Sequence, residues 1–397
     1  MIVSESPAVH LTYCLNIHPG ESWEENFLSI RTHATAVRDL VAPGSRFGLG
    51  LRLSARAADE LNHPHRLAEL RAFLDAHDLY VFTINGFPYG RFHETAVKAA
   101  VYRPDWRTTE RRDYTLALAD ILAALLPEGA VGSISTVPGS YRDWIEDDAD
   151  IEQITLRLAE VATYLARLRR RTGREIVLAL EPEPDCLLET AQEAAEFLTG
   201  PARSVGRDFL RLNFGMEEEL ADALLTRHVG VCLDTAHEAV AFRDPSDAMG
   251  KLRSMGVRLA KVQLSAALAC DASAVDHRLG PFRDETYLHQ VNTRSPAGDM
   301  HTYPDLPAAL AHGPRDNAQW RVHFHVPLHW EGDGPLRSTR EDMLGDAAVL
   351  LGGGECAHLE IETYTFDVLP EGMRALPVDE SIAREYRWVL DELLHVD

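Results

Sequence analysis

The sequence of 397 residues lacks several features that would assign it to a particular class of protein. Its five cysteines form no C-x-x-C pair and are odd in number, which excludes a zinc ribbon and a regular disulfide framework. We expect them to be buried, reduced thiols. No run approaches the ~18 apolar residues that a membrane span needs. No G-x-G-x-x-G or G-x-x-x-x-G-K-[ST] motif follows a candidate strand, so the phosphate cradles of Rossmann and P-loop proteins are missing.

Positive charge is also scarce. The chain has 39 Lys and Arg against 62 Asp and Glu, a formal net charge of −23. A chain this acidic repels a phosphate backbone, so nucleic acid is not an expected partner. The opening residues, MIVSESPAVHLTY, contain no basic segment followed by an apolar one, which argues against a signal peptide. We therefore expect a cytoplasmic protein.

What the sequence does contain is a regular alternation of apolar runs and amphipathic stretches. Residues that recur at three and four positions, the helical period, fill the stretches 23–41, 54–77, 151–171 and 385–394. Eight short apolar runs are candidate strands: 11–17, 47–53, 79–85, 131–137, 175–181, 230–235, 259–265 and 358–363. Eight strand–helix units with continuously apolar strands predict an α/β fold, a single (β/α)8 TIM barrel spanning residues 1–397.

One segment, residues 266–357, is too long to be a single crossover between barrel strands. It contains a further strand-like run, WRVHFHVPLHW, at 320–330. We expect an insertion after the seventh strand that serves as a cover for the active site, because long loops in compact domains are usually functional or disordered. In an alternative count, RVHFHVP is itself a barrel strand and an earlier run is not.

Three carboxylates stand where apolar strands end. Glu181 ends the fifth run, Asp234 the sixth and Glu362 the eighth, and TIM-barrel enzymes place their sites at these strand ends. A buried carboxylate is costly unless it is paired. Carboxylates with a nearby histidine, here His237, suit a divalent ion such as Mn, Co, Zn or Mg. We therefore predict a metal site.

Each of these residues also has a simpler interpretation. Glu181 could form a rim salt bridge, Asp234 could cap the following helix, and His237 could lie on a helix face. Glu183 is expected on the surface, since alternate residues of an extended chain point to opposite sides, and Glu183→Gln should leave metal binding intact. Glu360, one layer deeper than Glu362, could pair with another group inside the barrel.

Further ligands are expected from two places. Gln263, at the end of the seventh run, could coordinate through its amide oxygen or could simply line the barrel. In HFHVP, His323 and His325 share one face of a strand. They belong either to a histidine-rich surface strand or to a cover that donates a ligand or a substrate contact.

With these residues in place, the chain resembles the xylose isomerase-like TIM-barrel superfamily, on the motifs LALEPEP, CLDTAH and LEIET. The stretches HLTYCLNIHPGESW, INGFPYG, VYRPDW and HFHVP resemble the EboE-type proteins, which belong to clusters that make or traffic small metabolites. The resemblance to the superfamily implies one metal held by a glutamate, an aspartate, a histidine and a glutamate on strands five to eight. Here Glu181, Asp234 and Glu362 match, and Gln263 departs from the histidine. Gln263 or an insertion histidine, His325 or His323, would then complete the site.

The resemblance also implies roles in catalysis. Glu181 and Glu362 would be the acid/base pair of an isomerase or epimerase acting on a sugar or cyclitol, and His237 would orient a substrate hydroxyl. Substrate contacts are expected from Arg52, Asn85, His237, His323, Tyr89 and Trp106, although the aromatic residues could equally be packing beneath a loop. Two alternatives stay open: a metal-dependent phosphoester hydrolase, and a barrel that binds a metabolite without turning it over.

Overall fold

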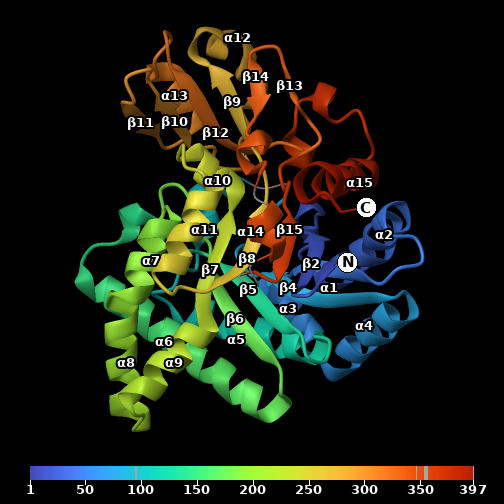
Figure 1. Cartoon of the computed structure of the whole chain (residues 1–397), viewed down its shortest axis with the longest axis vertical. Helices are drawn as coiled ribbons and strands as arrows, with labels where there is room; N and C mark the ends of the chain where they lie inside the picture. The colour runs from blue at the N-terminus through green and yellow to red at the C-terminus, as the bar shows by residue number, and fades with distance from the viewer. Residues whose placement is uncertain (94–95, 346, 353–355, 397) are drawn as a thin grey trace.

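The computed structural model describes residues 1–93, 96–345, 347–352 and 356–396. Its centre is a ring of parallel strands whose order is β2-β15-β8-β7-β6-β5-β4-β3 (Figure 1). An isolated parallel bridge from Cys14 to Gly50 joins β2 to β3 and closes the ring. The strands are β2 (Ala8–Tyr13), β3 (Phe47–Arg52), β4 (Leu79–Asn85), β5 (Val131–Thr136), β6 (Glu175–Leu180), β7 (Val229–Asp234), β8 (Leu259–Leu264) and β15 (His358–Ile361). The predicted (β/α)8 barrel is confirmed.

Seven of the eight expected runs match their strands to within two residues at either end. The first does not, because the strand covers Ala8–Tyr13 and Leu15–Ile17 form a short 3-10 helix. A short additional strand, β1 (Ile2–Glu5), pairs antiparallel with β2.

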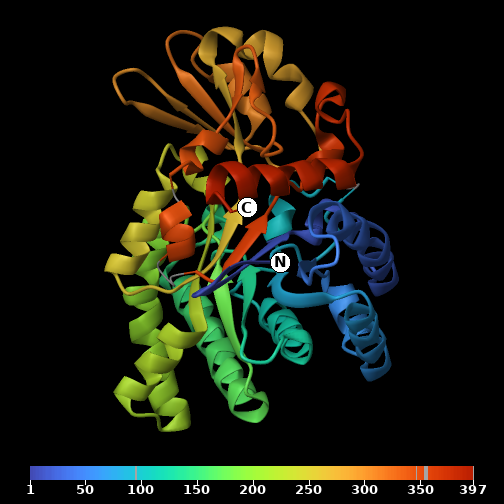
Figure 2. The same cartoon turned by 45° about the vertical axis from the view of Figure 1, so that its right-hand side comes forward.

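Helices surround the ring (Figure 2). They are α1 (Trp23–Ser29), α2 (Thr35–Val41), α3 (Ala55–Leu61), α4 (Pro64–Ala76), α5 (Thr109–Leu125), α6 (Asp148–Thr172), α7 (Ala191–Thr199), α8 (Pro201–Phe214), α9 (Glu218–His228), α10 (Thr235–Val240), α11 (Pro245–Ser254) and α15 (Val378–Trp388). Local sequence sets their ends: Ser22 and Glu25 form a capping box on α1, and Pro64 begins α4, dividing the stretch 54–77 into two helices. No helix in the described ranges is long and apolar enough to cross a membrane.

Between β8 and β15 the chain forms a second sheet, which lies against one end of the barrel (Figures 1 and 2). Its strand order is β11-β10-β12-β9-β14-β13, and every pair is antiparallel. The strands are β9 (Ala267–Asp271), β10 (Val291–Arg294), β11 (Met300–Tyr303), β12 (Gln319–His325), β13 (Gly332–Asp333) and β14 (Leu336–Ser338), accompanied by α12 (Val275–Arg278) and α13 (Leu306–His312). Helix α14 (Ala347–Gly352) follows in the chain and lies beside the barrel strand β15 (Figure 1).

The run RVHFHVP belongs to this second sheet. Strand β12 pairs with β9 and β10, so the alternative count that made it a barrel strand is wrong. Because β9 begins three residues after β8 ends, the second sheet starts at the carboxyl end of the barrel strands. Residues at the ends of its strands can therefore reach the end of the barrel where the candidate site lies.

Candidate metal centre and pocket

Three buried carboxylates occupy the carboxyl ends of the barrel strands. Glu181 follows β6, Asp234 ends β7 and Glu362 follows β15, and each is at most 4% exposed. Backbone hydrogen bonds to neighbouring strands fix two of them, Glu181 N to Thr136 O at 3.0 Å and Glu362 N to Leu264 O at 3.1 Å. The parallel ring thus delivers the three acidic side chains to one place.

Asp234 caps a helix and faces the site at the same time. Its Oδ1 accepts hydrogen bonds from Ser265 Oγ at 2.6 Å, Ala236 N at 2.8 Å and His237 N at 3.1 Å. Its Oδ2 is buried without a hydrogen-bond partner among the described residues. The capping interpretation therefore applies to Oδ1 and the metal interpretation to Oδ2 of the same side chain.

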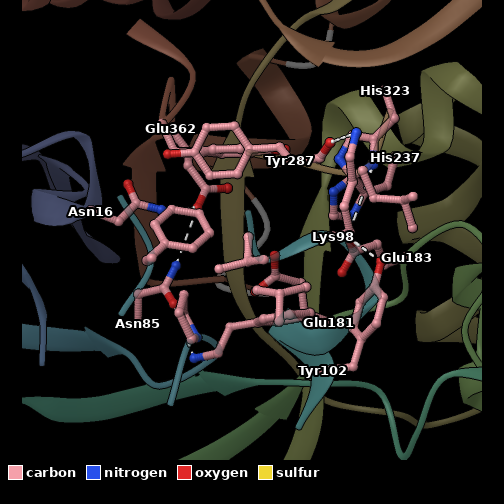
Figure 3. Close-up of a pocket in the computed structure, with 17 residues that line it drawn as sticks. Asn16, Asn85, Lys98, Tyr102, Glu181, Glu183, His237, Tyr287, His323 and Glu362 are labelled. Carbon is pink, nitrogen blue, oxygen red and sulfur yellow. Dashed lines mark hydrogen bonds and ion pairs between the residues drawn. The ribbon is translucent and has the colours of Figure 1, made fainter. Parts of the chain in front are cut away.

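The two glutamates differ in how firmly they are held. Glu362 Oε1 accepts from Asn16 Nδ2 at 2.7 Å and from Asn85 Nδ2 at 3.1 Å (Figure 3). Glu181 Oε2 is buried and has no hydrogen-bond partner in the part of the chain that the structure describes. One carboxylate is fixed by two amides, while the other has an oxygen free for a ligand.

Burial and mutual repulsion act on the protonation of this group. Burial, followed by the charge of Asp234, raises the pKa of Glu181 well above its usual range. Burial, followed by the charge of Glu181, does the same for the pKa of Glu362. For Asp234, burial raises the pKa, but the nearby His237 and His325 together with side-chain hydrogen bonds to Ser265 and Glu362 lower the pKa below the usual value. Carboxylates crowded in this way need protons or a cation.

Three histidines complete the polar cluster. His237 is in α10, and His323 and His325 are in β12. His237 Nε2 lies 3.9 Å from Asp234 Oδ1. Burial lowers the pKa of His323 well below its usual value and that of His325 to about 4, so both are neutral at pH 7. A neutral imidazole is the form that binds a metal.

The donor atoms fit a divalent ion. Three groups, each with ligand atoms within 4.8 Å of one another, overlap here: Glu181–Asp234–His237, Asp234–His325–Glu362 and His237–His323–His325. Buried oxygens and nitrogens without partners, in the described part of the chain, include Glu181 Oε2, Asp234 Oδ2, His323 Nε2 and His325 Nε2. Such orphaned atoms are costly in a dry interior, and a bound cation would satisfy them.

A fourth group, His18–His33–Asp379, lies outside this cluster. Its two imidazole rings are stacked, 4.3 Å apart and 11° from parallel. Parallel rings cannot direct their in-plane lone pairs at one ion, so this group fits a metal poorly as arranged.

Gln263 contacts a neighbouring strand inside the barrel. It is fully buried in β8, and its Oε1 accepts from Cys232 Sγ at 2.9 Å. It occupies the interior layer of the barrel, in line with the lining interpretation. Glu360 likewise lies deeper and forms an ion pair with the fully buried Lys261.

A pocket opens beside the carboxylates (Figure 3). Its polar lining residues are Asn16, Asn85, Glu181, Glu183, His237, His323 and Glu362. Aromatic residues also line it: Phe87, Phe92, Tyr102, Tyr287 and Tyr364. Polar groups placed among aromatic rings are typical of small-molecule sites.

Three expected substrate contacts lie elsewhere. The Arg52 guanidinium is tied to the carbonyls of Gly20, at 2.7 Å, and Gly90, and so braces two loops. Tyr89 packs edge-on against Tyr114. Trp106 is fully buried and donates to Val137 O at 3.0 Å. For Trp106 and Tyr89 the packing interpretation describes their position; Asn85 and His323 do reach the pocket.

Glu183 was expected on the surface, and that expectation is wrong. It is 8% exposed, lines the pocket, and accepts from Tyr102 Oη at 3.0 Å. Burial raises its pKa to about 7. The alternation rule fails because β6 ends at Leu180 and the chain through the two following prolines is no longer a strand.

Several pocket residues were not anticipated. Lys98 lines the pocket, but its Nζ pairs with Asp305 Oδ2 at 3.0 Å and donates to the carbonyls of Asp284 and Tyr287. Tyr287 comes from the 266–357 segment, where no local pattern distinguishes it. Tyr364 lies two residues after Glu362 in the sequence, so its position near the site could have been predicted.

No family model matches this sequence, and no curated protein does. Solved structures with similar chains include AsbF, a probable 3-DHS dehydratase of petrobactin synthesis from Bacillus anthracis (13% identity, 96% of this chain and 98% of that chain, TM-score 0.49). Others are the IolI protein with a bound zinc atom (13%, 98% and 99%, 0.47) and a xylose isomerase domain protein from Alicyclobacillus acidocaldarius (14%, 97% and 99%, 0.45). Similarity at this level leaves the activity of this chain open, and the EboE-type resemblance stays an expectation.

Proposed function

We propose that this protein is a divalent-metal-dependent isomerase or epimerase of a sugar or cyclitol-like metabolite, acting in the cytoplasm in an Ebo-type metabolite pathway. The observation that carries the proposal is the set of buried donor atoms on Glu181 and Asp234 that have no partner among the described residues, next to Glu362 and beside a pocket lined partly by aromatic residues. Glu181, Asp234 and Glu362 would hold the ion, with His325 within ligand distance of the last two. Bound there, a Mn, Co, Zn or Mg ion would polarise a substrate carbonyl and stabilise the enediolate that forms on proton loss.

The glutamates are suited to complementary roles. Glu362 is fixed by the amides of Asn16 and Asn85, which donate to its charged form and keep its position. Glu181 Oε2 has no such partner among the described residues, so Glu181 would hold the ion through Oε2 and exchange a proton through its other oxygen. An isomerase or epimerase needs two such groups with separate proton affinities.

The pocket favours an uncharged polyol. Its one lysine among the described lining residues, Lys98, is already engaged by Asp305 and two carbonyls. A phosphate would therefore find no free cationic side chain there and would meet Glu181, Glu183 and Glu362 instead. The aromatic side chains that line the pocket suit the apolar face of a sugar ring, and His237 would orient one hydroxyl. The 266–357 segment, which supplies Tyr287, Leu288 and His323, would act as the cover.

The experiment that tests the proposal is elemental analysis of untagged protein purified without chelator, with Asp234→Asn beside it. We expect bound Mn, Co, Zn or Mg in the wild type and its loss in the variant, because Asp234 belongs to two of the three ligand groups. Metal-loaded protein is then incubated in D2O with neutral ketoses and cyclitols, and exchange at the carbon next to the carbonyl is followed by NMR. Metal binding without exchange on any of them would support the binding protein, and phosphatase activity with Mn²⁺ or Zn²⁺ would support the hydrolase.

A further inference from the structure

Three imidazole rings meet beside Asp234. The ring centroids of His237 and His323 are 4.6 Å apart, those of His323 and His325 5.4 Å, and those of His237 and His325 5.8 Å. All three side chains are buried, and each offers a ligand atom within 4.8 Å of the others. One histidine comes from the barrel helix α10 and two from strand β12 of the second sheet.

The hydrogen bonds of two rings determine their tautomers. His237 Nδ1 lies 2.8 Å from Pro182 O, and His325 Nδ1 lies 3.1 Å from Glu362 O. A main-chain carbonyl can only accept, so each Nδ1 must carry the proton. In the neutral ring, Nε2 is then left with a lone pair.

The tautomer of the third ring, that of His323, follows from the side-chain amide of Gln290. Gln290 Nε2 lies 3.1 Å from Pro184 O, which can only accept, so this end of the amide must be the NH2 group. Gln290 Oε1 then faces His323 Nδ1 at 2.8 Å and accepts its proton. His323 Nε2 is therefore also an acceptor with a free lone pair. Gln290 Nε2 also contacts Tyr102 Oη at 3.2 Å, which ties the arrangement to Glu183 through Tyr102.

Three lone pairs converge in a buried site, and two of them lack a donor. His323 Nε2 and His325 Nε2 have no hydrogen-bond partner among the described residues. Nδ1 bound to an acceptor with Nε2 left open is also the way in which proteins orient metal-binding histidines. We propose that His237, His323 and His325 hold a second divalent ion through their Nε2 atoms, next to the ion held by the carboxylates.

The two positions differ in chemistry. Three imidazole nitrogens suit zinc, cobalt or nickel, whereas carboxylate oxygens suit magnesium or manganese. One imidazole nitrogen binds one ion, so His325 belongs to the histidine position when both are filled. Glu181, Asp234 and Glu362 then hold the other ion. The ion held by Glu181, Asp234 and Glu362 is the ion of the proposed function, and only that part of the inference rests on the proposed function.

The test is a Co²⁺ titration of the chelator-stripped full chain, followed by visible absorption and by metal analysis after desalting. The wild type should bind two ions. His323→Ala should bind one, and Glu362→Gln should lose the other, because the main-chain carbonyl of Glu362 that orients His325 is unchanged. Gln290→Leu keeps all three ligands but frees the His323 tautomer, and should weaken the histidine position about 10–100-fold. His329→Ala, outside the ligand groups, is the matched control and should bind two ions.

Each other outcome has one meaning. A single ion that Glu362→Gln removes and His323→Ala does not overturns the histidine position and leaves the proposed function standing. A single ion that His323→Ala removes and Glu362→Gln does not supports the histidine position and contradicts the proposed function. A single ion that both variants remove, two ions retained in His323→Ala, or no ion in the wild type would each overturn the inference. Circular dichroism and melting of the metal-free variants check folding, and if His323→Ala does not fold, Gln290→Leu decides.

Discussion

At Gly50, in β3, the barrel interior has no space for even a methyl group. A Cβ built there would lie 1.9 Å from Glu360 Oε1, the carboxylate that pairs with Lys261. We expect Gly50→Ala to lower the free energy of unfolding by about 1–3 kcal/mol, the usual cost of overpacking, or more if the ion pair is displaced. Urea denaturation of this variant and of Gly90→Ala measures the effect. Gly90 has open space around its Cβ position and should tolerate the change.

Glu183 tests which acidic residues belong to the metal site. Its carboxylate is engaged by Tyr102 and lies outside the candidate metal groups of the described residues. We expect Glu183→Gln to keep the metal content of the wild type, whereas Glu181→Gln and Glu362→Gln lose the ion that the carboxylates hold. Elemental analysis of the three purified variants measures this. Equal loss in all three would mean that Glu183 is a ligand.

At the scale of single residues, the sequence predicts the site residues that lie at the ends of regular strands. Glu181, Asp234 and Glu362 follow from strand ends alone, because parallel strands bring their carboxyl ends together. The sequence left Gln263 open between a ligand and a lining residue, because its contact with Cys232 on the neighbouring strand cannot be read from one strand of six residues. The position of Tyr287 depends on tertiary contacts between segments far apart in the chain, for which no local pattern exists.

Among the elements, helix α15 fastens the second sheet to the barrel through Glu385. Its Oε1 accepts from Leu328 N at 3.0 Å and from Thr363 Oγ1 at 2.6 Å. Burial raises the pKa of Glu385 to about 7. The folded state therefore binds a proton more tightly than the unfolded chain, and stability is lost as pH rises from about 4.5 to about 7.

Glu385→Gln should remove this pH dependence while keeping both hydrogen bonds. We expect the wild type to lose up to about 3 kcal/mol more than the variant between pH 5 and pH 8. Chemical denaturation at several pH values measures the free energy of unfolding of both proteins. In the difference between them, the contributions of all other titrating groups cancel. Parallel curves for the two proteins would mean that Glu385 is not protonated in the folded state.

The elements themselves were largely predictable, because the barrel strands are continuously apolar and lie between helical stretches. The second sheet was not, since β13 and β14 contain two and three residues and carry no periodicity. The assignment of β12 to that sheet depends on its pairing with β9, which only the tertiary structure defines.

For the whole molecule, metal binding should be linked to stability. Ligands from the barrel and from the second sheet converge on one cluster, so an ion bound there stabilises only the state in which the two are docked. Zn²⁺ at 100 times its dissociation constant should add about 2.7 kcal/mol. Calorimetry with and without chelator measures this, and an unchanged melting temperature would contradict a specific site. Asp234→Asn should show a smaller rise.

The pairing of β15 has a consequence for the order of folding. Ile361 in β15 pairs with Tyr13 in β2 and with Leu264 in β8, so the barrel strand that is synthesised last joins the barrel strand that is synthesised first. Until the ribosome has released residue 361 and the inserted sheet before it, β2 and β8 each present an open edge. Such edges promote aggregation, and contacts this distant in sequence form slowly. The nascent chain should therefore depend on chaperones for longer than a barrel whose seventh and eighth strands are joined by a short loop.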